Sequence, residues 1–272
     1  MMEFIGKRQP LSSTGLGLAL DHLGLQPAEA AVIWAVVDVE TSGVTQGCGF
    51  RVDGRPQILF ERHIFRRETQ GRFNQIAPHL SGPQGGYGSL ATQYAKLEEA
   101  LSLCATQGLG PEPALRSASW GLGQIMGFNA RLAGFDSAEA MVQAMRDGED
   151  AQILAMAGFL RSQNLHKALL RRDWAAFARG YNGPAYAQNQ YDVKLEQAYV
   201  RLASGSLPNL QLRAAQMALL YLGFSPGKID GVIGQRTRNA LNSFRLQAGL
   251  PAGSDLDGPC YIALCQKAGL QP

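Results

Sequence analysis

One stretch near the start of the chain is apolar at nearly every position. It runs from Ala28 to Val39, a pattern typical of a helix that is buried on all sides. Pro27 suits the first turn of such a helix, and Gly24 suits the end of a preceding one. The stretch leads directly into Glu40, so the pattern predicts a carboxylate at the end of a buried helix.

Shorter apolar runs separated by glycines come next. Phe50–Val52 and Gln57–Phe60 flank Asp53-Gly54, which predicts a small strand pair joined by a turn. Residues 71–90 are typical of a loop. Helical patterns resume near Ala91 and continue to about residue 202, with breaks at 108–111 and 182–184. This part of the chain is therefore expected to be mainly helical, with a small β-hairpin region.

A linker is predicted at Ser204-Gly205-Ser206-Leu207-Pro208, where small residues and a proline separate two helical patterns. After it, the sequence predicts three short helices, with the glycine-rich loop LGFSPGKIDGVIG between the first two. We therefore expect two domains, residues 1–204 and residues 205–272, that fold and act separately.

Composition and charge narrow the class of protein. The chain has 272 residues, of which 46% are hydrophobic and 17% charged, so a packed core is expected and disorder is not. Its formal charge is +3, and residues 206–272 hold all of that excess, with six Lys/Arg against three Asp/Glu. An excess this small does not predict nucleic-acid binding. The apolar runs are too short for a signal peptide or stable membrane insertion, and we expect a monomer made in the cytoplasm.

Cysteine and histidine spacing argues against disulfides and metals. The four cysteines are sparse for a disulfide framework and are expected to be reduced thiols: Cys48, Cys104, Cys260 and Cys265. The four histidines lack the spacing of a metal site: His22, His63, His79 and His166. The sequence also lacks a serine-hydrolase elbow and a phosphate loop. No metal or other cofactor is expected.

Three short motifs stand in a characteristic order. They are Glu40-Thr41-Ser42-Gly43, Gly121-Leu122-Gly123-Gln124-Ile125 and Tyr181-Asn182-Gly183. In this order they resemble the lysozyme-like superfamily that cuts peptidoglycan, including goose-type lysozymes and lytic transglycosylases. Four longer stretches are similar to the N-acetylmuramidase family of phage endolysins: 53–69, 85–100, 114–135 and 174–199. The resemblance covers roughly residues 15 to 202, with departures at Thr41, where Ser is common, and Gly123, where Phe or Met is common.

The last quarter of the chain has its own resemblance. Residues 210–250 are similar to the type 1 peptidoglycan-binding domain, on the pattern LGFSPGKIDGVIG followed by TRNALNSF. Ala240, Leu241 and Phe244 fit the inner face of a helix. Asp257, followed by Gly258-Pro259, suits the start of a third helix.

These resemblances imply a fold and a function. The fold would be mainly α, with a lysozyme-like α+β catalytic domain and a small three-helix binding domain. The activity would be that of a lysozyme-type glycoside hydrolase, an endolysin that cleaves the β-1,4 bond between N-acetylmuramic acid and N-acetylglucosamine. The C-terminal domain would hold the wall, and a separate membrane-permeabilising protein would release the enzyme from the host cytoplasm.

The resemblance also implies roles for individual residues. Glu40 matches the general acid, and its place at the end of an apolar helix should raise its pKa. Gln124, Tyr181 and Asn182 match substrate-binding residues of the cleft. Tyr87 either stacks on a sugar ring or is an ordinary loop aromatic. We expect Trp34, Trp120 and Trp174 to be core residues.

A second carboxylate is less well marked. Glu61 is the candidate, although it would equally suit an ion pair with Arg62, Arg66 or Arg67, and Asp53 is typical of a structural turn residue. Two other functions stay open. A lytic transglycosylase needs one acid and forms anhydromuropeptides, and a non-catalytic wall-binding virion protein needs none.

Overall fold

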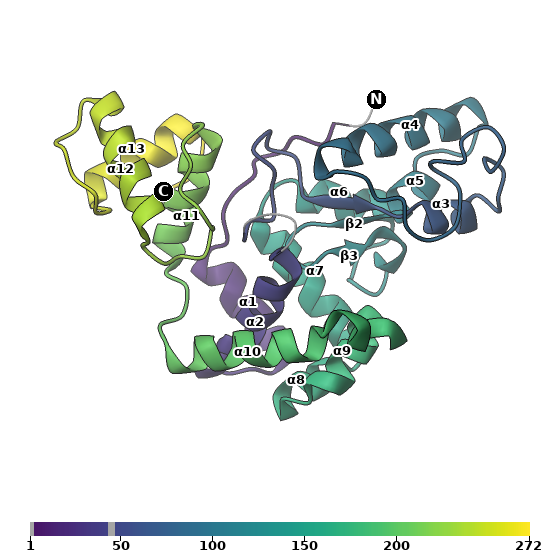
Figure 1. Cartoon of the computed structure of the whole chain (residues 1–272), viewed down its shortest axis with the longest axis horizontal. Coiled ribbons are helices and arrows are strands. Elements are labelled where there is room, and N and C mark those ends of the chain that lie inside the picture. The colour runs from purple at the N-terminus through teal and green to yellow at the C-terminus, as the bar shows by residue number, and fades with distance from the viewer. Residues whose placement is uncertain (1–2, 43–46) are drawn as a thin grey trace.

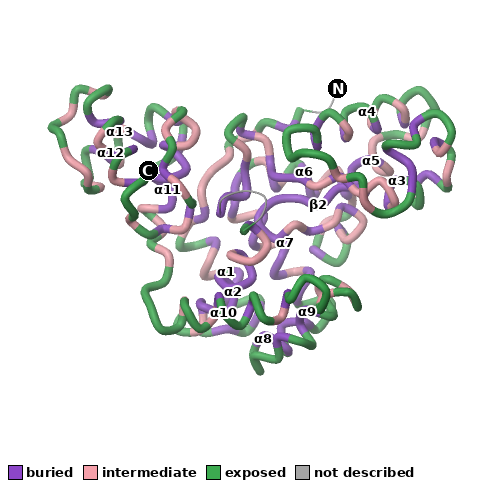
Figure 2. The backbone as a smooth tube through the Cα atoms, viewed as in Figure 1, coloured by how far each residue is buried: buried purple, intermediate pink, exposed green. Residues whose placement is uncertain are grey.

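A computed structural model describes residues 3–42 and 47–272 (Figure 1). The first part of the chain is mainly helical around one large core (Figure 2). Its long helices are α1 (Ser13–Leu23), α2 (Ala31–Thr41), α4 (Gln93–Thr106), α7 (Glu149–Ser162) and α10 (Tyr191–Ser204). The shorter ones are α3 (Arg62–Glu68), α5 (Glu112–Arg116), α6 (Ala138–Met145), α8 (His166–Arg171) and α9 (Trp174–Asn182).

The buried apolar helix is confirmed as α2. Ile33, Ala35 and Val36 are fully shielded from solvent, and α2 packs against α10. Pro27 opens a short 3-10 turn before α2 rather than α2 itself, and Gly24 closes α1 in the left-handed conformation, with φ 72°. Glu40 lies inside the last turn of α2. The helix therefore carries the carboxylate to the edge of the core.

Among the described residues, three short strands form one antiparallel sheet in the order β1-β2-β3. The strands are β1 (Ile58–Phe60), β2 (Ala118–Trp120) and β3 (Ile125–Met126), and Leu59 lies opposite Ser119. The predicted strand pair around Asp53-Gly54 is wrong, because Phe50 and Pro56 form only an isolated bridge and β1 pairs with β2 instead. The turn itself does form, and two backbone hydrogen bonds flank the bridge, from Arg51 N–H to the Arg55 carbonyl at 2.8 Å and from Gln57 N–H to the Gly49 carbonyl at 2.9 Å.

Residues 205–272, all of them described, contain the three expected helices: α11 (Leu210–Tyr221), α12 (Gln235–Ala248) and α13 (Gly258–Ala268). They enclose a separate core that includes Leu219, Leu241 and Phe244. As expected, Asp257 caps α13, and its carboxylate accepts a hydrogen bond of 2.9 Å from the Cys260 backbone N–H.

The two parts of the chain meet at a buried contact. Cys48 and Phe50 of the first part pack with Met217 and Ile229 of the second in a small core of their own. A buried ion pair between Arg213 and Glu149 also joins the two parts. Domains of one chain move relative to each other by default unless a large apolar interface joins them, and here apolar side chains from both parts are buried together.

The thiol prediction is confirmed. All four cysteines lie within the described residues, and all are buried and free. None of the helices in the described part of the chain has the length and apolar character needed to cross a membrane.

Candidate active site

Glu40 lies between two long helices. The Tyr191 hydroxyl, at the start of α10, donates a hydrogen bond to the Glu40 carboxylate on α2. Burial raises the pKa of Glu40 to about 7, and the hydrogen bond from Tyr191 opposes that rise. The carboxyl can thus hold a proton near neutral pH, as the apolar helix led us to expect. Sequence reasoning missed Tyr191, because only the packing of α10 on α2 brings it to Glu40.

Tyr181 and Asn182 lie beside this carboxyl, at the end of α9. The Tyr181 hydroxyl donates a 2.5 Å hydrogen bond to the Gly123 carbonyl, and its ring stacks on Phe177 at 5.3 Å between centroids. Burial and the nearby Glu40 raise the pKa of Tyr181 well above its usual value. Asn182 lies beside the Tyr191 side chain. The structure therefore brings the first and third sequence motifs together.

The second motif forms the loop between β2 and β3. Gln124 has φ 45°, and its amide is engaged within the hairpin: its Oε1 accepts from the Ser119 hydroxyl and its Nε2 donates to the Gly121 carbonyl, both at 2.8 Å. These contacts fix the loop shape. A direct contact of Gln124 with substrate stays a prediction.

Gly123, the departure from the family pattern, has a packing reason. A Cβ at this position would lie 2.8 Å from Cβ of Met156, which is fully buried on α7. Real carbon atoms do not approach so closely without rearrangement. Met156 fills the space that a larger residue at 123 would need, so glycine belongs to the way this chain packs its loop on α7.

Glu61 belongs to a different cluster, at the junction of β1 and α3. Its Oε2 lies 3.1 Å from Nδ1 of His63, and the Tyr87 side chain lies close to the same carboxylate. Burial raises the pKa of Glu61, while the charge of His63 opposes the rise. The alternative of an ion pair with Arg62 or Arg67 is not formed, because Arg62 donates to the Pro83 carbonyl and Arg67 pairs with Glu68.

The two carboxylates therefore have separate surroundings. Glu40 contacts helices α9 and α10, whereas Glu61 contacts His63 and the loop that holds Tyr87. Asp53 is a structural turn residue, paired with Arg51 at 3.2 Å and Arg55 at 2.9 Å. The three tryptophans are core residues as expected, exposed by 4%, 0% and 9%: Trp34, Trp120 and Trp174.

Comparison with known proteins decides the family. Residues 29–203 match the model of the N-acetylmuramidase family. The chain belongs to this family. Residues 209–254 match a putative peptidoglycan binding domain. The muramidase is also similar to the crystal structure of the Burkholderia AP3 phage endolysin, with 38% identity, a TM-score of 0.60, and coverage of 71% of this chain and 70% of that one. No curated protein was found to match it.

A muramidase domain followed by a peptidoglycan-binding domain is the architecture of a modular phage endolysin. The mainly helical fold, with its small sheet and helical C-terminal domain, agrees with that architecture. The muramidase is accordingly a peptidoglycan hydrolase. The roles of its individual residues, and the bond it cuts, rest on the chemistry of the site.

Proposed function

We propose that the muramidase hydrolyses the β-1,4 bond between N-acetylmuramic acid and N-acetylglucosamine. The observation that carries this proposal is the Glu40 carboxyl, whose pKa of about 7 leaves it partly protonated at neutral pH. A protonated carboxyl in a cleft can donate to the leaving glycosidic oxygen as the bond breaks. Membership of the muramidase family supports the same assignment.

The surrounding residues would each have a part in this step. Glu40 transfers its proton to the leaving oxygen while a water attacks the anomeric carbon, and a base takes the proton of that water. Tyr191 holds the Glu40 carboxylate by its hydrogen bond, and Asn182 lies beside Tyr191. Tyr181 anchors the loop of Gly123 beside the acid. Gln124, Tyr181 and Asn182 are the proposed sugar-binding residues.

Glu61 is the proposed second carboxylate, with Tyr87 beside it. The buried position that raises its pKa, and the contacts with His63 and Tyr87, are features of a functional carboxylate as well as of a structural one. Tyr87 is half-buried in its loop and linked to Glu61, so a stacking role on a sugar ring stays a proposal.

One alternative stays open, a lytic transglycosylase. Such an enzyme needs one acid, because the 6-hydroxyl of the muramic sugar attacks in place of water and an anhydro sugar is released. The contacts of Glu40 include no second carboxylate among the described residues. The chemistry of the products separates the two reactions.

Mass spectrometry of muropeptides, digested in water labelled with oxygen-18, tests the proposal. Hydrolysis at the proposed bond yields reducing-end N-acetylmuramic acid that carries the label. An anhydro end without label would establish the transglycosylase, and a reducing-end N-acetylglucosamine would mean that the other bond is cut.

The C-terminal domain is the proposed wall anchor. A groove between α11, the following loop and α12 offers mixed polar and apolar contacts for glycan or stem peptide: Leu220, Phe224, Ser225, Pro226, Gly227, Arg236, Asn239, Ala240 and Ser243. Arg236→Ala is expected to weaken sacculus binding by about fivefold or more, as loss of an interfacial arginine does, without slowing cleavage of soluble glycan. Unchanged sacculus binding would move the anchor to another face.

We further propose that wall cleavage serves host lysis, and that a separate membrane-permeabilising protein delivers the enzyme to the wall. A non-catalytic virion protein is disfavoured by the assembled set of Glu40, Tyr181 and Tyr191. Loss of turbidity of purified wall material on adding the full chain supports catalysis, and stable turbidity with bound protein would favour the virion protein.

A further inference from the structure

Residues 47–50, which follow α2 in the chain, are in contact with the C-terminal domain. Arg213 on α11 is only 1% exposed and forms an ion pair with Glu149 on α7, which is fully buried. The same guanidinium donates a 2.7 Å hydrogen bond to the Gly47 carbonyl. Glu149 in turn accepts from the backbone N–H of Gly49 at 2.8 Å and of Leu11 at 3.0 Å. This buried ion pair thus links the two domains, and its two side chains also hydrogen-bond residues 47–49.

Close packing accompanies this ion pair. Gly47 has φ 95°, and a Cβ at this position would lie 2.4 Å from the Ile229 carbonyl oxygen, so the loop of the C-terminal domain lies directly on the segment. Cys48 and Phe50 pack against Ile229 and Met217 in the shared core. Residues 47–50 therefore take part of their apolar cover from the C-terminal domain.

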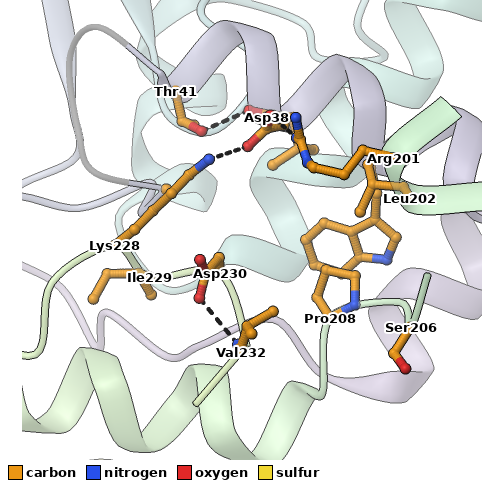
Figure 3. Close-up of a pocket in the computed structure, with 13 residues that line it drawn as sticks. Asp38, Thr41, Arg201, Leu202, Ser206, Pro208, Lys228, Ile229, Asp230 and Val232 are labelled. Carbon is orange, nitrogen blue, oxygen red and sulfur yellow. Dashed lines mark hydrogen bonds and ion pairs between the residues drawn. The ribbon is translucent and has the colours of Figure 1, made fainter. Parts of the chain in front are cut away.

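The C-terminal domain also contacts the helix before Glu40. Lys228 forms an ion pair with Asp38 on α2, and Arg201 of α10 pairs with the same carboxylate at 2.5 Å (Figure 3). The Arg213 guanidinium lies 5.8 Å from the ring centroid of Trp34, one turn earlier on α2. The domain therefore touches the polypeptide on both sides of Glu40.

Gln152 on α7 connects residues 47–50 to the loop between β2 and β3. Its Oε1 accepts a 2.9 Å hydrogen bond from the Leu122 backbone, and its Nε2 donates to the Gly49 carbonyl at 3.3 Å. Leu122 precedes Gly123, whose carbonyl holds Tyr181 beside Glu40. These contacts form a continuous series from Arg213 to the β2–β3 loop beside Glu40.

We propose that Arg213 is a positioning residue for Glu40, and that the C-terminal domain is a structural part of the catalytic site as well as a wall anchor. The proposal rests on the proposed role of Glu40. Without Arg213, Glu149 would hold a buried charge with no partner, and the segment that depends on both would relax. On this proposal, residues 1–204 without the C-terminal domain would cleave more slowly than the full chain.

The experiment measures kcat and KM of the full chain on soluble glycan strands, released from sacculi by amidase treatment, which are cut without wall anchoring. The variants are Arg213→Met and Lys228→Ala. Arg238→Met is the matched control, because Arg238 is on the same domain but pairs with the exposed Asp255. Glu40→Gln is measured alongside. Circular dichroism and sacculus pull-down report folding and wall binding.

Arg213→Met is expected to lower kcat by about tenfold to a hundredfold, the loss that a misplaced catalytic group causes, and to move the alkaline limb of kcat to lower pH as water reaches Glu40. Lys228→Ala should lower kcat by a smaller factor, and Arg238→Met should keep the wild-type kcat. All of these variants should still bind sacculi. If folded Arg213→Met keeps the wild-type kcat and its alkaline limb stays in place, the proposal is overturned. If Arg213→Met does not fold, wild-type kcat in Lys228→Ala overturns it. Unchanged kcat in Glu40→Gln would instead reject the proposed function.

Discussion

Glu40 keeps its proton because the effect of burial outweighs that of an opposing hydrogen bond. Burial at the end of α2 disfavours the charged carboxylate, while the Tyr191 hydroxyl stabilises it by donating a hydrogen bond. The pKa of about 7 is their sum, well above the ordinary value of 4.5. A pKa near the working pH suits a general acid, since the group is both available and ready to release its proton.

Tyr191→Phe separates these effects. Removing the hydroxyl takes away a donor that stabilises the ionised carboxylate, so the pKa of Glu40 should rise. The alkaline limb of kcat is then expected to move to higher pH by about half a unit to one unit, the free-energy equivalent of one net hydrogen bond. Tyr186→Phe is the control, because Tyr186 contacts Arg179. A limb that stays in place or moves to lower pH would contradict this reading.

The same pKa predicts how stability depends on pH. Below about pH 4.5 Glu40 is protonated in both the folded and unfolded states, and it contributes no difference. As the pH rises towards 7, the unfolded state ionises first, so the folded state loses stability. In denaturant titrations, the free energy of unfolding should fall by at most about 3 kcal/mol across this pH range, relative to that of Glu40→Gln. A difference that is constant with pH would show that the carboxyl has an ordinary pKa.

Glu61→Gln tests the second carboxylate. Because Glu61 lies in the cluster with His63 and Tyr87, we expect a loss of turnover of about tenfold, smaller than that of Glu40→Gln, which removes the proton donor. The matched control is Glu99→Gln, a surface glutamate that also lies 3.0 Å from a histidine, His79. Turnover on soluble glycan strands is the measurement. A loss equal to that of Glu40→Gln would assign Glu61 as the base that positions water.

At the scale of elements, helices were predicted better than sheet pairing. The apolar run predicted α2, and the Asp257-Gly258-Pro259 signal predicted the start of α13. The partner of β1 was missed, because it lies in a distant part of the chain and no local pattern encodes it. Tyr191 was missed for the same reason. Its role depends on how α10 packs on α2, whereas Glu40 was marked by its own helix.

Gly123→Ala tests the packing of the β2–β3 loop on α7. The added methyl would meet Met156, so unfolding free energy should fall by about 1–3 kcal/mol, as overpacking does, and turnover should fall as Tyr181 loses its carbonyl partner. Gly17→Ala is the control: Gly17 lies within α1, and a Cβ there meets nothing within 4 Å. Thermal melting of both variants is the measurement. Equal melting temperatures for Gly123→Ala and wild type would show that Met156 yields freely.

For the whole molecule, the structure changes the meaning of the basic C-terminal charge. Arg213 and Lys228 pair with Glu149 and Asp38 across the domain interface, rather than facing the wall. Two further arginines pair within the C-terminal domain, Arg238 with Asp255 and Arg245 with Asp257. Two of the six basic residues of 206–272 therefore join the two domains, and steering towards an anionic envelope is correspondingly weaker. Sequence counting alone could not show this, because pairing depends on the fold.

The central claim is that Glu40 supplies the proton. The most direct test is turnover of Glu40→Gln on purified peptidoglycan, with thermal melting and sacculus pull-down measured on the same sample. Glutamine keeps the shape of the side chain but has no proton to give, and general acid catalysis contributes about 10²–10⁴-fold. We predict near-complete loss of turnover with folding and wall binding retained. Turnover above about a tenth of wild type would contradict the claim and require another carboxyl as the acid.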